Sequence, residues 1–314
     1  MNLDSGPSAV HIASGGTRSP LAANFISIIR EVYKGLAEES DLSPTNLAVT
    51  NLIDRLKTRL LHSYSPDEVQ AVLSDPFVRE VQPDLLAKLS VYESESERYY
   101  SRQFCQSEQS GLDAITRLPG WNIYQSLVTR ELQLLRRFSW QGRLESPIVF
   151  VGSGPMPLSA ILLHLYSDID VIGLEVDDEA YAISRDLLDC LGLSDRVNVR
   201  LENGETFNYN AARTVFIASL VTNKVAVLEQ IRRTCDDPLI AIRTAEGMRQ
   251  LMYESVDEAQ LTNRGWALLG RTTPQEQLVI NSTLFIARQE SVMHREDVSD
   301  GESTSDNGNE SDIE

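Results

Sequence analysis

The sequence predicts an α/β protein in which an all-helical N-terminal domain precedes a doubly wound, mostly parallel sheet. Two observations carry this prediction. Residues 20–140 show helical apolar stripes and no strand-like alternation, whereas residues 145–290 alternate short apolar runs with helical patterns. Repeated strand–helix–strand units with short connections are typical of parallel sheets that helices cover on both faces.

The helical half contains start signals for several helices. Serine is a preferred N-cap, and proline is tolerated at the first helical position, so Ser43-Pro44 and Ser65-Pro66 are each predicted to open a helix. Pro83 is predicted to open a longer helix that runs to about Phe104. The five predicted helices begin near Leu21, Pro44, Pro66, Pro83 and Trp121.

The second half is predicted to form six strands with helices between several of them. The last apolar segment has no comparable helix before it, which indicates a terminal hairpin with one strand inserted antiparallel. Such a sheet is Rossmann-like, of the class I methyltransferase type. The predicted strands cover residues 148–151, 170–174, 197–201, 214–219, 239–243 and 278–287, and the predicted helices cover 158–165, 179–191 and 224–234.

Composition and charge exclude several classes of protein. The 314 residues carry a net charge of −18, which argues against nucleic-acid binding because that function needs a basic footprint. No apolar run approaches the roughly 18 residues that span a bilayer, and no secretory signal opens the chain. Three separated cysteines and four histidines show no metal-ligand spacing, so we expect no metal site and a cytoplasmic location. Residues 1–19 and the acidic tail 291–314 are expected to be disordered.

A glycine-rich turn joins the first predicted strand to the next helix. Residues 147–158 read PIVFVGSGPMPL, and Gly152-Ser153-Gly154-Pro155 form the turn. Glycine lets the chain turn sharply and brings the backbone close to a ligand. The turn lacks the diphosphate-binding GxGxxG pattern, and Pro155 and Pro157 remove potential N–H donors. We therefore expect a cofactor without a diphosphate, and S-adenosylmethionine is the obvious candidate.

Polar or small residues follow the other predicted strands at the same edge of the sheet. Glu175 ends the second strand, 21 residues after Gly154, where an acid commonly accepts hydrogen bonds from ribose hydroxyls. Arg243-Thr244 ends the fifth strand and either binds a substrate carboxylate or forms a strand-end ion pair. Further residues expected at the cofactor are Asn203 and Gly204 after the third strand and Ala218, Ser219 and Leu220 after the fourth.

Three segments resemble the nicotianamine synthase family, including its bacterial opine-metallophore relatives. They are FVGSGPMPLSAILL, RTAEGMRQLMY and VINSTLFIAR, within a resemblance that covers residues 92–288. The resemblance implies a transferase that moves the 3-amino-3-carboxypropyl (aminobutanoyl) arm of S-adenosylmethionine onto an amine and releases 5′-methylthioadenosine. The product would be nicotianamine, or a related metallophore precursor after a single transfer onto an external amino acid, with a role in metal homeostasis.

The resemblance also implies which residues act on the substrate. A glutamate in an E-x-E-(K/R) setting maps onto Glu95, with Glu93 as the second choice, and a tyrosine maps onto Tyr124. Alternating Glu and Ser on a helix is equally typical of a solvated face, and Tyr124 has the spacing of a core aromatic. An S-adenosylmethionine-dependent methyltransferase and a non-enzymatic binding module are the competing interpretations.

Overall fold

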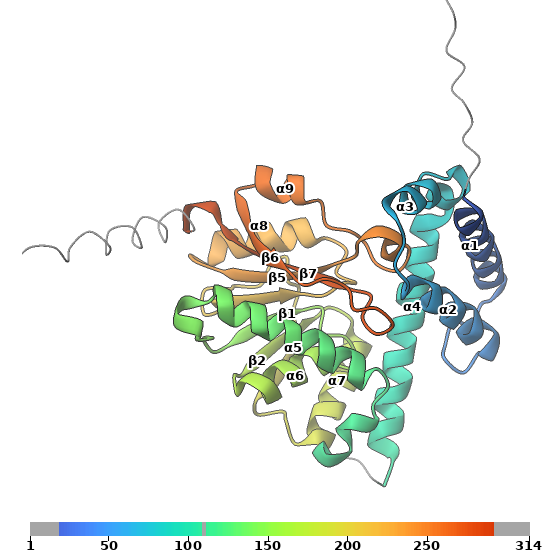
Figure 1. Ribbon diagram of the computed structural model, residues 1–314. Coiled ribbons are helices and arrows are strands. Elements are labelled where there is room, and N and C mark those ends of the chain that lie inside the picture. The colour runs from blue at the N-terminus through green and yellow to red at the C-terminus, as the bar shows by residue number, and fades with distance from the viewer. Residues whose placement is uncertain (1–18, 109–110, 292–314) are drawn as a thin grey trace, which may run out of the picture.

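The computed structural model describes residues 19–108 and 111–291 (Figure 1). The predicted disorder of residues 1–19 and 291–314 therefore concerns, apart from residues 19 and 291, residues outside the described part. The N-terminal half forms α1 (Pro20–Glu38), α2 (Leu47–Leu60), α3 (Pro66–Leu73), α4 (Pro76–Gln106), η1 (Leu112–Arg117), α5 (Trp121–Phe138) and η2 (Trp140–Gly142).

The helix starts follow local hydrogen bonding, and one predicted cap was wrong. Asn46, rather than Ser43, caps α2, because its side-chain oxygen accepts from the backbone N–H groups of Ala48 and Val49. The predicted start of α3 is confirmed. There Ser65 and Glu68 form a reciprocal capping box, which satisfies two backbone donors at once.

α4 is longer than the sequence predicted. Asp75 caps it, and Pro76 takes the first helical position. Pro83, predicted as the start, lies inside the helix. The apolar stripe of Val78, Val81 and Leu85 continues across it, so burial of that face outweighs the hydrogen bond that a proline removes. α4 thus runs for 31 residues, from the other N-terminal helices to the helix at residues 178–191 that lies against the sheet.

The second half forms a seven-stranded sheet in the order β3-β2-β1-β4-β5-β7-β6. All neighbouring strands are parallel except at β7, which pairs antiparallel with both β5 and β6. This confirms the predicted α/β fold and its antiparallel hairpin. The strands are β1 (Ile148–Val151), β2 (Val171–Glu175), β3 (Val197–Leu201), β4 (Thr214–Ile217), β5 (Leu239–Thr244), β6 (Trp266–Arg271) and β7 (Ser282–Arg288).

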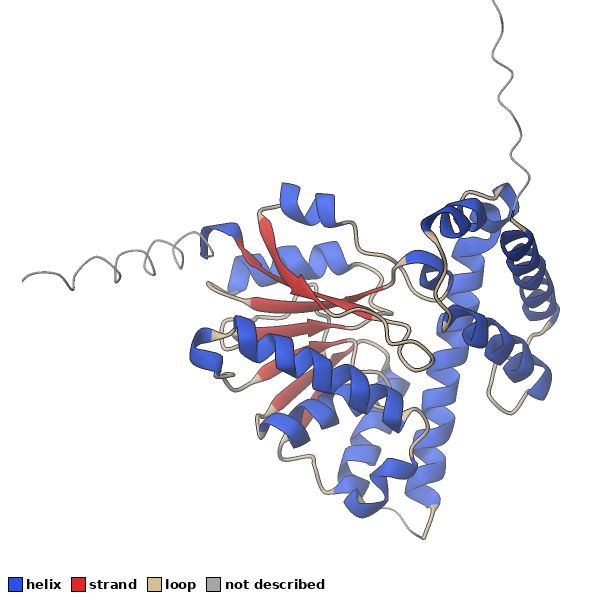
Figure 2. Ribbon diagram, in the orientation of Figure 1, coloured by secondary structure: helices blue, strands red, loops and turns tan. Residues whose placement is uncertain are grey.

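Helices cover both faces of this sheet (Figure 2). One apolar cluster joins α5, α6 (Leu158–Ser167) and α7 (Asp178–Leu191) to one face, and another joins α8 (Lys224–Thr234) and α9 (Glu258–Asn263) to the other. Although the sequence assigned α5 to the helical half, its buried face, including Val128 and Leu132, packs with the sheet. The domain boundary expected near residue 140 therefore does not coincide with the boundary in packing, because α5 precedes residue 140 and packs with the sheet.

A third cluster holds the N-terminal helices together and ties them to the sheet. It contains buried side chains from α1, α2, α3 and α4. It also contains Met248 and Leu251 from η3 (Gly247–Leu251) and Met252 directly after it, in the segment that follows β5. Residues 278–281, predicted as strand, instead close a loop in which Gln275 and Val279 exchange backbone hydrogen bonds. The segments after β5 and before β7 thus lie against the N-terminal helices at the carboxyl ends of the parallel strands.

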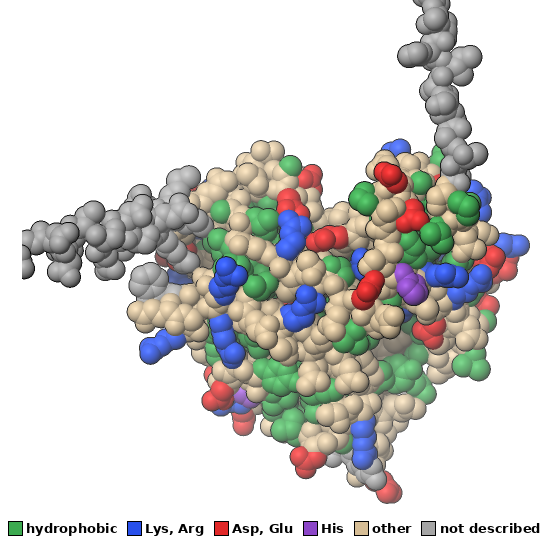
Figure 3. All heavy atoms as spheres, in the orientation of Figure 1, with side chains coloured by type: hydrophobic (Ala, Val, Ile, Leu, Met, Phe, Trp, Pro, Cys, Tyr) green, Lys and Arg blue, Asp and Glu red, His purple; other side chains and the backbone are tan. Residues whose placement is uncertain are grey.

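On the face drawn in Figure 3, basic side chains lie over the sheet half, separated from one another by uncharged surface, and they form no continuous patch. No helix within residues 19–108 and 111–291 is both long and apolar enough to cross a membrane.

Candidate active site

The glycine turn lies at the carboxyl end of β1, where the sheet order reverses between β1 and β4. Gly152 and Gly154 have φ values of +77° and +72°, which favour glycine. The N–H groups of Gly152 and Ser153 donate to the Leu174 carbonyl, at 2.9 and 3.1 Å. Gly154 N–H donates to the Glu175 carboxylate at 2.9 Å, so the N–H groups of all three residues have acceptors within the protein. The turn is held against β2.

Glu175 lies beside this turn, at the end of β2. Its Oε1 accepts from the backbone N–H groups of Val176 and Asp177, at 2.8 and 3.0 Å, and its Oε2 accepts from Gly154. A carboxylate has about four lone-pair sites, so three hydrogen bonds leave it capacity for one more donor. The position expected for a ribose contact is therefore present, and the contact itself stays a prediction.

The residues expected after the third and fourth strands divide into packed and accessible positions. Gly204 is buried, and a Cβ there would lie 2.6 Å from a Val151 methyl group, so the absence of a side chain at this position serves packing. Asn203 is exposed, although its side chain accepts from the Glu205 N–H. Ala218 and Leu220 are accessible on the next loop.

The loop after β4 is fixed by a buried lysine. Lys224 Nζ donates to the carbonyls of Ser219 (2.8 Å) and Val221 (2.7 Å). The Ser219 hydroxyl accepts from the Asn281 amide at 2.5 Å. Burial lowers the pKa of Lys224 to about 8. Ser219 is therefore held in place by α8 and by the loop before β7.

α4 places a carboxylate directly over the glycine turn. The carboxylate belongs to Glu97, since a Cβ added at Gly154 would lie 2.6 Å from Glu97 Oε2. Tyr124 Oη on α5 donates to Glu97 Oε1 at 3.2 Å. The hydroxyl of Ser101, one turn further along α4, donates to the Pro155 carbonyl and fixes the helix on the turn. The structure thus brings Tyr124 to an acid on α4, and its catalytic role stays a prediction.

The acid expected in that role, Glu95, lies elsewhere. Its carboxylate pairs with Arg98 at 2.7 Å, and its side chain is 39% exposed. Arg98 also pairs with Asp177, at the start of α7. Two helical residues apart, Glu95 and Glu97 point to different faces. The structure therefore does not bring Glu95 to the turn.

A second carboxylate–tyrosine pair lies one helical turn before the first. Tyr253 Oη donates to Glu93 Oε1 at 2.7 Å, and Lys57 Nζ lies 3.7 Å from the same oxygen. Glu93, the second choice from the sequence, thus faces the site together with Glu97. The segment RTAEGMRQLMY (residues 243–253) contributes its last residue, Tyr253, to this site.

The electrostatics of these groups favour a cationic ligand. Burial raises the pKa of the Glu97 carboxyl from about 4.5 to about 8, and the Glu93 and Glu175 carboxylates add to this rise. Hydrogen bonds from Tyr124 and from the Met156 backbone oppose it. Burial also raises the pKa of Tyr124 and Tyr253 well above 10. Because the carboxylates repel one another, a bound cation would stabilise their ionised forms.

Arg243 has a structural position, and its expected role in binding a substrate carboxylate is not supported. Its Nε and Nη2 donate to the two oxygens of buried Glu131, each at 3.0 Å, and its Nη1 donates to the Ser159 hydroxyl. Thr244 accepts from the Val256 N–H and is also buried. The alternative left open by the sequence, a strand-end ion pair, is what the structure contains.

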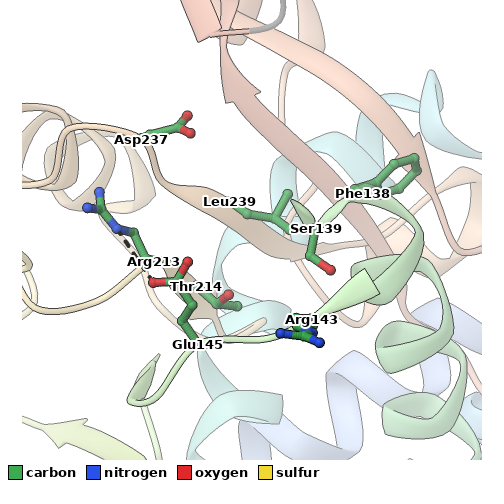
Figure 4. A pocket seen from close by; sticks show the side chains of 8 residues that line it. All are labelled: Phe138, Ser139, Arg143, Glu145, Arg213, Thr214, Asp237 and Leu239. Atoms are coloured by element: carbon green, nitrogen blue, oxygen red, sulfur yellow. Dashed lines mark ion pairs between the residues drawn. The ribbon is translucent and has the colours of Figure 1, made fainter. Parts of the chain in front are cut away.

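One cavity lies away from these groups. It has a volume of about 440 Å³ and is found at the amino ends of β4 and β5, beside Thr214 and Leu239 (Figure 4). Arg213 and Glu145 form a 3.8 Å ion pair at its wall. Ligands of open α/β sheets bind at the carboxyl ends of the strands, so this cavity does not define the candidate site. No group of three or more potential metal ligands occurs within residues 19–108 and 111–291.

Comparison with known proteins identifies the family. A family model described as nicotianamine synthase protein matches residues 19–294. The chain belongs to the nicotianamine synthase family. The resemblance found in the sequence, and the prediction of an enzyme of this type, are thereby confirmed.

The relatives include plant and bacterial enzymes. Probable nicotianamine synthase 2 of Hordeum vulgare is 26% identical over 292 residues, which cover 88% of this chain and 84% of that protein. The L-histidine 2-aminobutanoyltransferase of Pseudomonas aeruginosa is 32% identical over 133 residues, covering 42% of this chain and 50% of that protein. The solved structure of MtNAS in complex with MTA and tNA is 22% identical, covers 87% of this chain and 99% of its own, and has a TM-score of 0.74.

Sequence reasoning missed Glu97, Tyr253 and Lys57. For Glu97, the helical period of the sequence offered a signal. Leu89, Glu93, Glu97 and Ser101 recur every four residues and share one face of α4, whereas Glu95 lies off that face. For Lys57 and Tyr253 the sequence offered no signal, because their neighbour Glu93 is 36 and 160 residues away.

Proposed function

We propose that this protein transfers the 3-amino-3-carboxypropyl group of S-adenosylmethionine onto an amine and releases 5′-methylthioadenosine, to make nicotianamine or a related metal chelator. The observation that supports this most directly is the Glu97 carboxylate, which lies over the glycine turn and accepts a hydrogen bond from Tyr124. A variant of the related MtNAS has been solved in complex with S-adenosylmethionine. A proton acceptor at the turn is what alkylation of an amine by this molecule needs.

The proposed step is a substitution at the carbon next to the sulfonium. The lone pair of a neutral amine forms the new C–N bond while the C–S bond breaks, and the electron pair of that bond stays on sulfur. A neutral thioether leaves. The proton of the amine passes to Glu97, whose pKa of about 8 matches an amine donor better than an ordinary carboxylate does.

The other residues bind the substrate and orient its reacting end. Glu175 is assigned to the ribose, and the accessible positions Asn203, Ala218 and Leu220 to the adenosine. Gly152, Ser153, Gly154 and Pro155 fix where the reacting end lies. The acidic surroundings, with Glu93 and Glu97 on one helix face, suit a ligand that carries both a sulfonium and an ammonium.

Product analysis tests this function. Purified protein is incubated with S-adenosylmethionine, with and without histidine, and all products are identified by mass spectrometry. We expect 5′-methylthioadenosine and one or more aminobutanoyl-amine products. Release of S-adenosylhomocysteine instead would indicate a methyltransferase, and an unchanged substrate would contradict an enzymatic role.

A substitution at the turn tests the proximity of Glu97. Gly154→Ala is expected to lower turnover at least roughly tenfold, because the new Cβ would lie 2.6 Å from Glu97 Oε2 and displace it. The matched control is Gly192→Ala. Gly192 has a similar φ of +68° and nothing within 4 Å of its added Cβ, so only backbone strain of about 1–2 kcal/mol is introduced.

Steady-state turnover and denaturant unfolding of both variants separate the two effects. We expect both to lose similar stability, and only Gly154→Ala to lose activity. Equal activity of the two variants would contradict the placement of Glu97 over the turn.

A further inference from the structure

Two of the three cysteines lie where α4 packs on α7, and the proposed transfer step does not use them. The Cys105 thiol, on α4, donates to the backbone carbonyl of Asp186 on α7, with 3.7 Å between sulfur and oxygen. Cys190 follows Asp186 by four residues, so both lie on one face of α7. In a helix, the side chain four residues after a carbonyl lies beside that carbonyl oxygen. The two thiols are therefore neighbours of the same backbone oxygen.

The packing of the two helices explains this arrangement. Contacts between them advance in the same direction along both chains, and the Arg98–Asp177 ion pair, 2.9 Å long, comes first. Seven residues further along α4, Cys105 meets Asp186, nine residues further along α7. Cys190 comes one helical turn later on the same face, and its thiol is a hydrogen-bond partner of the Cys105 thiol. The fold thus brings the two sulfurs together.

Both thiols are accessible to a small reagent. Cys105 and Cys190 are each partly exposed, whereas Cys235 is only 2% exposed. A cavity of about 210 Å³ lies between α4 and α7, and Cys105 forms part of its wall. A reagent in solution can therefore reach this pair without unfolding the protein.

The surroundings give the two sulfurs different roles. Burial raises the pKa of the Cys105 thiol to about 12, and its hydrogen bond with Cys190 and the charges of the Cys190 thiolate and the Asp186 carboxylate add to the rise. Thiol–disulfide exchange starts from a thiolate. Because Cys105 holds its proton, the first attack falls to Cys190. Once the Cys190 sulfur is bonded to the reagent, its charge no longer opposes ionisation of Cys105, which can then attack in turn.

We propose that Cys105 and Cys190 are a modification site at which a small-molecule disulfide forms a reversible disulfide bond between α4 and α7. The Cys190 sulfur attacks one sulfur of the reagent, whose S–S bond breaks and releases a first thiolate. The Cys105 sulfur then attacks the Cys190 sulfur of this mixed disulfide and releases a second thiolate. Two protein thiols are oxidised, one small disulfide is reduced, and the two thiol protons pass to the released thiolates. The modification does not depend on the proposed transfer.

Thiol mapping of the native full chain tests the site. The protein is incubated with oxidised glutathione, free thiols are alkylated, and digested peptides are compared by mass spectrometry with and without reduction. We expect one cross-link, between Cys105 and Cys190, while Cys235 is alkylated only after unfolding, and a dithiol should reverse the bond. Thiols that all stay free, glutathione that remains on one cysteine without a cross-link, or a cross-link that forms only in denaturant would each overturn the proposal.

The unfolding temperature of the oxidised and reduced protein gives a second readout. Cys105 and Cys190 are 85 residues apart, and a bond that closes such a loop restricts the unfolded chain. We expect oxidation to raise Tm by roughly 5 °C or more. A lower Tm after oxidation would indicate a bond that strains the packed helices and would contradict a site suited to it.

Serine variants test the order of attack. Cys105→Ser should retain glutathione on Cys190, because the second attacking thiol is missing, and Cys190→Ser should react little. Neither variant should show the cross-link or the rise in Tm. The matched control is Cys235→Ser, which keeps a hydrogen-bond donor for the Ala212 carbonyl and should keep both effects. Loss of the cross-link in Cys235→Ser, or a rise in Tm retained by Cys105→Ser, would overturn the assignment.

Discussion

Glu97→Gln is expected to lower turnover of S-adenosylmethionine by roughly 10² or more, the usual loss when a general base is removed. Glutamine has nearly the same shape and can still accept the hydrogen bond from Tyr124, which is 3.2 Å long in the wild type. It cannot take a proton from the amine. Affinity for 5′-methylthioadenosine, measured by calorimetry, should therefore change little.

Glu95→Gln is the matched control for this substitution. The change is chemically identical and lies two residues away on the same helix, where it disturbs only the partly exposed pair with Arg98. Such pairs contribute about 0–1 kcal/mol, so activity and stability should stay near wild type. A large loss of turnover in Glu95→Gln, with Glu97→Gln active, would reverse the assignment.

The raised pKa of Glu97 adds a pH dependence with a defined sign. Because the folded pKa is about 8 and the ordinary value about 4.5, the native state binds this proton more tightly than the unfolded state. Its contribution to stability is therefore complete below about pH 4.5 and is lost as the pH rises through 8. The difference in unfolding temperature between Glu97→Gln and wild type should therefore shift in favour of the variant when the pH is raised from 5 to 8.5.

The same titration should appear in the kinetics. kcat/KM reports ionisations of the free enzyme, so in wild type it should rise with pH to a midpoint near 8 as Glu97 loses its proton. The profile of Glu97→Gln should lack this rise of kcat/KM with pH. A wild-type profile that is flat between pH 6 and 9 would contradict Glu97 as the base.

Much of the fold follows from local patterns in the sequence. The bounds of β1, β3 and α8 match the predicted ranges, because an apolar run or stripe is bounded there by glycine, proline or a polar residue. Errors arose where tertiary packing outweighed a local signal. Pro83 marks a helix start in isolation, yet the buried stripe of α4 continues through it.

The candidate site was harder to predict because it is built from distant segments. The turn at Gly154 is local and was found. Its partner Glu97 is 57 residues earlier, and only the face of α4 that packs on Pro155 decides between neighbouring glutamates. The role of Arg243 likewise depends on Glu131, 112 residues away, which had no distinguishing pattern of its own.

Arg243→Met is expected to destabilise the protein by about 3–5 kcal/mol, because it leaves the Glu131 charge buried and unpaired. Glu131 is fully buried and receives two hydrogen bonds from Arg243, each 3.0 Å long, and one from Thr283 (2.6 Å). These bonds join α5 to β5 and β7. Denaturant unfolding monitored by circular dichroism measures the loss.

The exposed pair of Arg264 and Glu229 provides the comparison. Its separation is 2.8 Å, shorter than the 3.0 Å of the buried pair, but its side chains are 39% and 48% exposed. Arg264→Met should therefore cost at most about 1 kcal/mol. The double variant Glu131→Leu/Arg243→Met should recover much of the loss, since it removes both buried charges. If Arg243→Met kept wild-type stability and weakened only S-adenosylmethionine binding, the carboxylate-binding role first expected for Arg243 would be restored.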